Sequence, residues 1–261
     1  MRRREDSKKR LNIRIAGALL IALAGICLLL YPKVDNLLYE NKVAAEKEAF
    51  QNKIQETRSA VRAGYVYSVE NYDDDDHYNY MPDPYEELYQ FLKAENERLF
   101  ETGQDELIDA FSYQTAGIDL SGYGLEDECI GYLEVPSIGI QLPIYLGANS
   151  ENMSKGAVHM THTSYPIGGN NTNAVIAAHR GGTREMLRNI HQIQIGDEVI
   201  ITNFKERLVY QAKEIRIIMS TDVSEVKIQE GRDLITLLTC NPLGNNYQRY
   251  VLYCERSTAL G

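Results

Sequence analysis

The chain has 261 residues and four cysteines, enough for one substantial domain with attachments and too few for a disulfide scaffold. Its formal net charge of −10 at pH 7 argues against nucleic acid as a partner, because phosphate binding needs a basic face. The cysteines form no CxxC pair and no zinc spacing, so we expect no metal and no other cofactor.

The first 31 residues are typical of a membrane anchor. Residues 1–14 form a basic segment, and residues 15–31 are uncharged and almost wholly apolar. These seventeen residues, at about 1.5 Å each, come close to the thickness of a bilayer core. The positive charge predicts a cytoplasmic N-terminus, a single transmembrane pass and a domain outside the cell membrane. A cleaved signal peptide and a lipoprotein site at Cys27 are the alternatives.

Residues 32–79 are predicted to form a helical stalk and an acidic linker. Between residues 37 and 61 apolar residues recur at loose helical spacing among many charges, which is typical of a solvated helix that lifts a domain off the membrane. The acidic run at 73–76 could bind calcium, but it lacks the ligand spacing of an EF-hand loop. We therefore interpret it as a solvated linker.

Residues 80–125 are predicted to hold a loop followed by N-terminal helices. In "MPDPYEELYQFLKAENERLF", Pro84 stands at a first helical turn and is followed by Glu86 and Glu87, which is helix-start chemistry. From residue 126 to 256 the pattern changes to short β-like runs separated by Gly, Pro and Asn. This series is typical of a mostly β domain that forms a closed or nearly closed barrel, with one helical insertion at "TREMLRNIHQI" and a tail at 257–261.

The stretch "ITLLTCNPLGNNYQRYVL" predicts a β-hairpin with a cysteine at its rim. A turn at residues 243–246 pairs Cys240 with Gln248 or Arg249, and Cys254 with Ile235. The two cysteines are then too far apart along the ladder for a disulfide. Arg249 can bring its guanidinium over the Cys240 thiol, where a cation favours the thiolate. The alternative is a buried cysteine and a surface arginine that merely share a hairpin.

Five histidines are candidates for a general acid or base. His77 lies in the acidic linker, His191 lies in the helical insertion, and His159 and His162 form "HMTH", whose spacing lacks a clear third metal ligand. His179 differs because it ends the apolar run "AVIAA" and opens into "RGG", which places it at a strand end beside a loop. His179 is a functional candidate if the strand end that carries it meets the one that carries Cys240. Otherwise it is a polar side chain bonded to the backbone.

Several segments in order resemble the sortase family. "TLLTC" at 236–240, Arg249 downstream and "AAHRGG" upstream resemble the sortase signature. The likeness extends over residues 80–255 through "GYLEVPSIGIQLPIYLG", "GAVHMTHTSYPIGG" and "NAVIAAHRGG", in the order expected of class C, or pilus-type, sortases. "MPDPY" resembles the Asp-Pro-aromatic lid that those enzymes lay over their own active site.

The resemblance implies a closed eight-stranded sortase-type barrel with short helices, and a membrane-bound cysteine transpeptidase on the outer face of a Gram-positive bacterium. Its substrates would be surface proteins or pilins with an LPxTG-like sorting signal. Cys240 would attack the Thr carbonyl and form a thioacyl enzyme. His179 would protonate the departing amine and deprotonate the incoming one, and Arg249 would stabilise the oxyanion. The acceptor amine would come from a pilin lysine, as in pilus assembly, or from a peptidoglycan crossbridge.

The resemblance also implies a lid of Asp83, Pro84 and Tyr85. Asp83 would pair with Arg249, and Tyr85 would cover Cys240 until substrate displaces them. Removing this lid should then raise the reactivity of the thiol.

Three departures from the family pattern concern the lid, the substrate groove and pilin polymerisation, in that order. The lid aromatic is Tyr85 where Phe or Trp is more usual, "HRGGTREML" departs from the family's usual continuation after the histidine, and the chain shows no second apolar span, which pilus-type enzymes often carry. Pilin polymerisation and attachment to the wall therefore both remain open. So do a cysteine hydrolase of the same peptides and a membrane-anchored adhesion or scaffold protein.

Overall fold

The computed structural model describes residues 2–70, 83–105, 107, 114–125, 127–182 and 184–257. Its helices and helical turns are α1 (Arg2–Glu70), α2 (Pro84–Glu101), η2 (Ser121–Tyr123), η3 (Pro136–Ile138), α3 (Ser150–Lys155), η4 (Ile190–Gln192) and η5 (Ser224–Val226). Its strands are β1 (Cys129–Val135), β2 (Ile140–Leu146), β3 (Ala157–His159), β4 (Thr172–Ala177), β5 (Glu198–Asn203), β6 (Arg207–Met219), β7 (Asp233–Asn241) and β8 (Gln248–Arg256). The acidic run at 73–76 and His77 lie outside the described residues.

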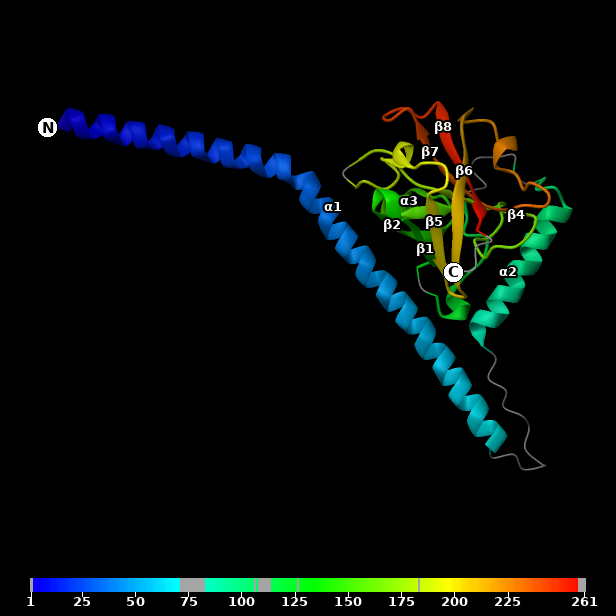
Figure 1. Cartoon of the computed structure of the whole chain (residues 1–261). Coiled ribbons are helices and arrows are strands. Elements are labelled where there is room, and N and C mark those ends of the chain that lie inside the picture. Colours follow the sequence, from blue (N-terminus) through cyan, green and yellow to red (C-terminus); the bar gives the residue numbers. More distant parts are fainter. Residues whose placement is uncertain are drawn as a thin grey trace.

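Eight strands close into a barrel in the order β1-β2-β3-β4-β7-β8-β6-β5 (Figure 1). The pair β2–β3 and the pair β4–β7 are parallel, and the other neighbours are antiparallel. Closure leaves no unpaired strand edge, so the chain needs no further element to cover one. The predicted closed eight-stranded barrel is confirmed.

The strand sequences match the burial that each strand needs. In β6, Leu208, Tyr210 and Ala212 are buried and alternate with more exposed neighbours, the period-2 pattern of a strand with one face in the core. In β7, every residue from 234 to 239 is buried, which explains its almost continuous apolar and β-branched run. Burial in β7 ends at Cys240, so the strand itself carries this thiol from the core to the rim.

The run from residue 130 to 147 folds as two strands, because Gly139 adopts a left-handed φ of 66° and turns the chain between β1 and β2. The predicted helical insertion is wrong. Of residues 184–192, only Ile190–Gln192 form a helical turn. Leu187 and Ile190 are both fully buried, and the Leu187 amide donates to the His179 carbonyl at 3.0 Å. Packing onto the barrel therefore overrides the helical pattern here.

The prediction of a solvated stalk is wrong for the middle of α1, which packs along the flank of the barrel (Figure 1). Val43 and Ile54 are 1% and 7% exposed, and the Phe50 ring meets the Tyr132 ring of β1 edge-on, 5.4 Å between centroids. Residues 43, 50 and 54 recur at helical spacing and form one apolar stripe. Each such side chain stabilises the packed helix by about 1.5–3 kcal/mol when fully buried.

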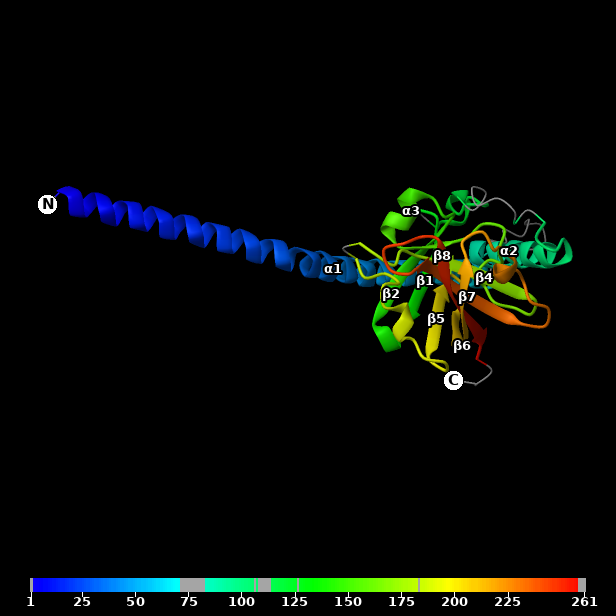
Figure 2. The ribbon, with the colours of Figure 1, turned by 90° about the horizontal axis from the view of Figure 1, so that it is seen from above.

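The N-terminal part of α1 is apolar and exposed. Leu20 and Ile21 are 69% and 76% exposed, and Figure 2 shows this stretch projecting away from the barrel. Within the described residues, α1 is the one helix long and apolar enough to cross a membrane, by length and composition, from Ile15 onward. This finding is compatible with the predicted membrane anchor at residues 15–31.

Helix α2 begins where the sequence predicts a helix start. Pro84 is its first residue, and the carboxylate of Asp83 caps it by accepting the N–H of Tyr85 at 2.9 Å. Leu88 and Leu92, one turn apart, are fully buried against the rest of the domain. The cap and this apolar face together fix where α2 starts and which side of it faces inward.

Candidate active site

Cys240 and His179 stand at the ends of two neighbouring parallel strands. The last backbone bond between β4 and β7 joins the Ala178 amide to the Leu238 carbonyl at 3.2 Å, and the Thr239 hydroxyl donates to the Ala178 carbonyl at 2.7 Å. His179 follows Ala178 directly, and Cys240 follows Thr239 directly. The parallel register therefore brings the imidazole and the thiol to the same point of the rim.

Arg249 reaches the same point from β8. In the β7–β8 hairpin Cys240 pairs with Arg249 and Ile235 pairs with Cys254, as the sequence predicts. Directly opposed residues of an antiparallel pair place their side chains on the same face of the sheet. The arginine and the rim cysteine therefore share one face of the hairpin. The second cysteine of the hairpin lies deep in the barrel.

The Arg249 guanidinium is only partly engaged by the protein. Its Nη1 donates to the carbonyls of Asn246 and Gln248 at 2.6 and 3.1 Å. Among the described residues, its Nε and Nη2 have no hydrogen-bond acceptor and no carboxylate pairs with it. A guanidinium carries five N–H donors, so several remain for an oxygen of a bound peptide.

A pocket of about 230 Å³ unites the three side chains, because His179, Cys240 and Arg249 all line it. The rest of its wall is mostly apolar and comes from segments far apart in the sequence, among them Met153, Met160, Ile218, Val223, Val226 and Leu238. A pocket that combines polar reacting groups with a mostly apolar wall is suited to a peptide with apolar side chains near its scissile bond.

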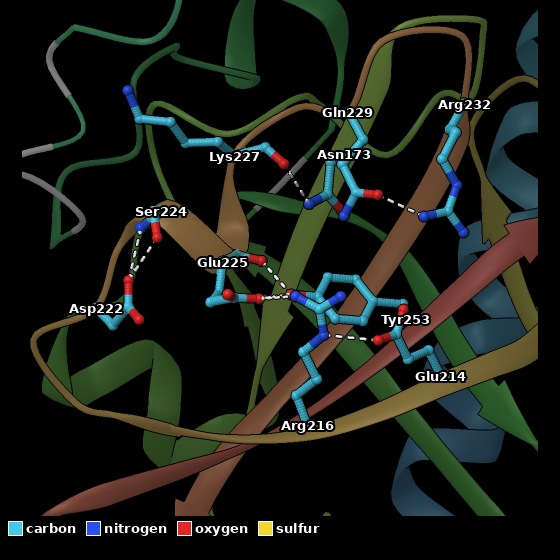
Figure 3. Close-up of polar contacts among 10 residues, drawn as sticks. All are labelled: Asn173, Glu214, Arg216, Asp222, Ser224, Glu225, Lys227, Gln229, Arg232 and Tyr253. Carbon is cyan, nitrogen blue, oxygen red and sulfur yellow. Dashed lines mark hydrogen bonds and ion pairs between the residues drawn. The ribbon is translucent and has the colours of Figure 1, made fainter.

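The connection between β6 and β7, which supplies part of this wall, is held by a polar network (Figure 3). Arg216 of β6 forms an ion pair with Glu225, and the Tyr253 hydroxyl of β8 donates to the same carboxylate at 3.0 Å. The Asn173 amide of β4 donates to the Lys227 carbonyl at 3.1 Å. Three strands thus anchor the connection, and the pocket wall it carries has a fixed position.

The described cysteines differ in their capacity to form a thiolate. All four are free, and Cys240 is partly exposed, whereas Cys129 and Cys254 are buried. Burial raises the pKa of Cys129 to about 12 and also raises the pKa of Cys254, because a thiolate loses its hydration there. Cys27 lies in the apolar stretch of α1. Cys240 is therefore the thiol suited to nucleophilic chemistry at neutral pH.

The histidines separate in the same way. His179 is exposed at the rim. His159 is 1% exposed, stacks on Tyr165 with 5.0 Å between ring centroids, and has its Nε2 3.0 Å from the Ser164 carbonyl. Burial lowers the pKa of His159 to about 4, so it remains neutral and structural. No group of three or more potential metal ligands occurs among the described residues. His191 is exposed in η4, away from the pocket lining.

The predicted lid does not lie over the thiol. The Asp83 carboxylate is bonded to the Tyr85 amide as a helix cap, and it forms no ion pair with Arg249, although the structure describes both residues. The Tyr85 ring is 1% exposed and packs against Phe204, just after β5, with 6.2 Å between ring centroids. Neither residue lines the pocket. The Asp-Pro-Tyr triplet fits both a lid and a helix start, and local capping together with burial of the ring favours the helix start.

Arg180 is a site residue that the sequence analysis missed. With His179 and Cys240 it lines a second pocket of about 410 Å³, on the side of the turn between β7 and β8. Its Nη1 donates to the Cys240 carbonyl at 3.2 Å and to the Asn241 side-chain oxygen at 2.7 Å. The β4–β7 register ends with Ala177 opposite Leu238, and its offset, carried three residues further, puts position 180 level with position 241.

The closed barrel, with Cys240 near the end of β7 and His179 and Arg249 beside it, defines the class of protein: a β-barrel enzyme with a cysteine nucleophile. A sortase-domain family model matches residues 133–257. The chain is similar to the structure of sortase C2 of Pilus Island 1 from Group B Streptococcus. The two are 32% identical, with a TM-score of 0.54, over 64% of this chain and 96% of that one. Sortase C from Clostridium perfringens SM101 is 27% identical, with a TM-score of 0.57, over 76% of this chain and 98% of that one.

A curated relative agrees with the structural neighbours. Sortase D of Bacillus subtilis (strain 168) is 28% identical over 131 residues, which span 49% of this chain and 64% of the relative's own length. The chain belongs to the sortase family, whose members are cysteine transpeptidases, and its structural neighbours are class C sortases.

Proposed function

We propose that this protein is a membrane-anchored transpeptidase that cleaves an LPxTG-like sorting signal through a thioacyl enzyme and transfers the cleaved protein to an amine. One observation carries the proposal. Cys240, His179 and Arg249 all line one pocket at the ends of β4, β7 and β8. Acyl transfer from an amide needs these three functions, a nucleophile, a proton donor for the amine and donors for the oxyanion.

The reaction assigns each side chain one step. Sγ of Cys240, as thiolate, attacks the scissile carbonyl carbon, and the resulting oxyanion accepts hydrogen bonds from the N–H groups of Arg249 that have no acceptor within the described part of the protein. The C–N bond then breaks, and the leaving amine takes a proton from His179. An incoming amine gives its proton to His179 and attacks the thioester, which forms the new amide and frees the thiol.

Two features support the cellular setting. The apolar stretch of α1 from Ile15 onward is long enough to anchor the chain, and the basic residues before it favour a cytoplasmic N-terminus with the barrel outside. Two structural neighbours are sortases of a pilus island, which favours a pilin lysine as the acceptor amine and pilus assembly as the process. An amine of the peptidoglycan crossbridge is the second candidate, because curated relatives include sortases A and D.

The test is mass spectrometry of the full-length protein after incubation with LPxTG-like peptides, with and without an added primary amine. We expect a thioester adduct on Cys240, and a new amide product only when the amine is present. Lysine side-chain amines and N-terminal glycine amines, added separately, distinguish the two acceptor classes. Cys240→Ala should form no adduct, whereas Cys254→Ala, which removes a buried thiol of the same hairpin, should retain it.

The other candidate activities give different products. A cysteine hydrolase would release the free acid at the same rate with and without amine. An adhesion or scaffold protein would form no adduct with any peptide. Either result would overturn the proposed transfer.

A further inference from the structure

We propose that Arg180 is a positioning residue that joins the ends of β4 and β7 and thereby fixes the imidazole of His179 against the thiol of Cys240. This inference rests on the proposed function. It concerns a residue that lies outside the lining of the 230 Å³ pocket and that lines, with His179 and Cys240, the 410 Å³ pocket beside the turn between β7 and β8.

Arg180 is the link between the two strand ends beyond the point where their backbone ladder stops. The last backbone bond joins Ala178 to Leu238, and the Thr239 hydroxyl adds one bond to the Ala178 carbonyl. Past Ala178, the hydrogen bonds that the described residues make between the loop after β4 and the end of β7 are those of Arg180, at 3.2 Å to the Cys240 carbonyl and at 2.7 Å to the side chain of Asn241.

The guanidinium acts from the face of the sheet opposite the thiol. Successive side chains of a strand point to opposite faces, so Asn241, to which Arg180 bonds, faces away from Cys240. On that face the guanidinium carbon lies 5.3 Å from the centroid of the Tyr250 ring, and the Asn241 amide donates to the Gln248 side chain at 3.3 Å. Arg180 is thus braced on β7 and β8 together.

The loop after Arg180 turns away from β7, so the bonds of Arg180 to Cys240 and Asn241 are what hold it there. Gly182 adopts φ 107°, a conformation that L side chains rarely adopt, so the chain turns sharply away from the strand after Arg180. His179 itself is exposed, and its own backbone bond in this region is to the Leu187 amide of the same loop. Without Arg180, the chain beyond Ala178 would have no hydrogen bond to β7 among the described residues, and the two bonds of Ala178 to Leu238 and Thr239 would be the last that join the two strand ends.

The first experiment separates positioning from binding. In the full-length protein, Arg180→Ala should lower kcat for thioacyl formation about 10- to 100-fold and leave KM within about twofold, because a displacement of about 1 Å between reacting groups costs rates of this order. Arg180→Lys keeps the charge but lacks the planar fork, so it should restore only part of the rate. Arg184→Ala is the matched control, since Arg184 lies in the same loop but stacks on Tyr39 of α1.

The second experiment needs no peptide substrate. The rate of alkylation of Cys240 by iodoacetamide, followed by mass spectrometry of its peptide, is measured in the wild type, His179→Ala, Arg180→Ala and the double variant. If Arg180 holds the imidazole near the thiol, the effect of His179→Ala should be several-fold smaller in the Arg180→Ala background. A loss of stability alone would leave this ratio unchanged at temperatures well below the melting transition.

Two outcomes would overturn the inference. One is a kcat for Arg180→Ala equal to that of the wild type or of Arg184→Ala. The other is an effect of His179→Ala that is the same in both backgrounds. If Arg180→Ala does not fold, Arg180→Lys takes its place in both experiments. A wild type that forms no thioacyl adduct would refute the proposed function, while the alkylation cycle would still decide the role of Arg180.

Discussion

The sequence predicts functional residues both at the rim of the barrel and on its flank, but in the structure only those at the rim line the pocket. At the rim, Cys240 and Arg249 lie opposite each other in the hairpin, and His179 ends the neighbouring strand. On the flank stand Asp83 and Tyr85, which the family resemblance places over the thiol. Asp83 caps helix α2, and the Tyr85 ring packs against Phe204, just after β5.

The difference comes from how far a local pattern constrains its surroundings. A β-ladder has a fixed repeat, so one correct turn determines every pair along the hairpin. Cys240 with Arg249 and, five residues further along each strand, Ile235 with Cys254 both follow from it. A short Asp-Pro-aromatic triplet has no ladder. Its position depends on which of two competing contacts gains more, and here the helix cap and a buried ring outweigh contacts across the pocket.

The largest expected effect is at the rim. His179→Ala should lower the rate of thioacyl formation by about 10²–10⁴-fold, because the leaving amine loses its proton donor. His191→Ala, which removes an exposed histidine outside the pocket lining, is the control and should keep the wild-type rate. Stopped-flow or quenched assays of adduct formation on Cys240 measure both. Full activity of His179→Ala would remove this residue from the mechanism.

On the flank, the expected effect is on stability and not on the thiol. Tyr85→Ala removes a ring that is 1% exposed and packs on Phe204, so the free energy of unfolding should fall by about 3 kcal/mol. The rate of iodoacetamide alkylation of Cys240 should stay within about twofold of the wild type at a temperature where the variant is folded. A marked rise in alkylation would instead show that Tyr85 covers the thiol, and the contrast between rim and flank would fail.

The sequence predicted what periodicity and register determine. The strand pattern predicts a closed or nearly closed barrel, and the family resemblance adds the closed eight-stranded form that the structure has. The turn at 243–246 predicts Gln248 or Arg249 opposite Cys240 and no bond between Cys240 and Cys254; the structure pairs Cys240 with Arg249, and both cysteines are free. It did not predict β3, which has three residues and too short a pattern. Arg180 was missed because its partners, the Cys240 carbonyl and Asn241, lie about sixty residues away in the sequence. They belong to a neighbouring parallel strand, and no hairpin turn sets the register of such a pair.

Helical patterns were predicted well only where nothing else competed. The start of α2 follows its Pro and acidic residues, while "TREMLRNIHQI" lost its predicted helix to the burial of Leu187 and Ile190. The stalk was expected to be solvated because its apolar residues are sparse, but Val43 and Ile54 suffice to bind a helix to a barrel flank. Propensity is thus a weak guide wherever a few apolar side chains can reach a core.

A second histidine sharpens the contrast between rim and interior. Burial lowers the pKa of His159 to about 4 in the folded protein, below its value of about 6.5 in an unfolded chain. The unfolded state therefore binds the additional proton, and stability is full above pH 6.5 and is lost as the pH falls toward 4. We expect this group alone to lower the free energy of unfolding by about 2 kcal/mol between pH 7 and pH 5.

The measurement is urea denaturation of the full-length protein in detergent at several pH values, for the wild type and for His159→Gln. Glutamine can still donate to the Ser164 carbonyl but does not titrate, so the variant should lose the slope that corresponds to one proton in this window. An identical pH dependence in both proteins would show that His159 is not the group that titrates.

The smallest expected effect concerns the residue on which the two interpretations of the flank differ most. As a helix cap, the Asp83 carboxylate satisfies the Tyr85 amide, so Asp83→Ala should cost about 1 kcal/mol of stability and Asp83→Asn much less, because asparagine also caps helices. If Asp83 were instead a lid residue paired with Arg249, both substitutions would remove the ion pair equally, and both would speed the labelling of Cys240. Chemical denaturation and alkylation of the same two variants therefore decide between a cap and a lid. If Asp83 is a cap, Asp83→Asn is more stable than Asp83→Ala, and Cys240 is labelled at the wild-type rate in both. If Asp83 is a lid residue, the two variants behave alike, and Cys240 is labelled faster in both than in the wild type.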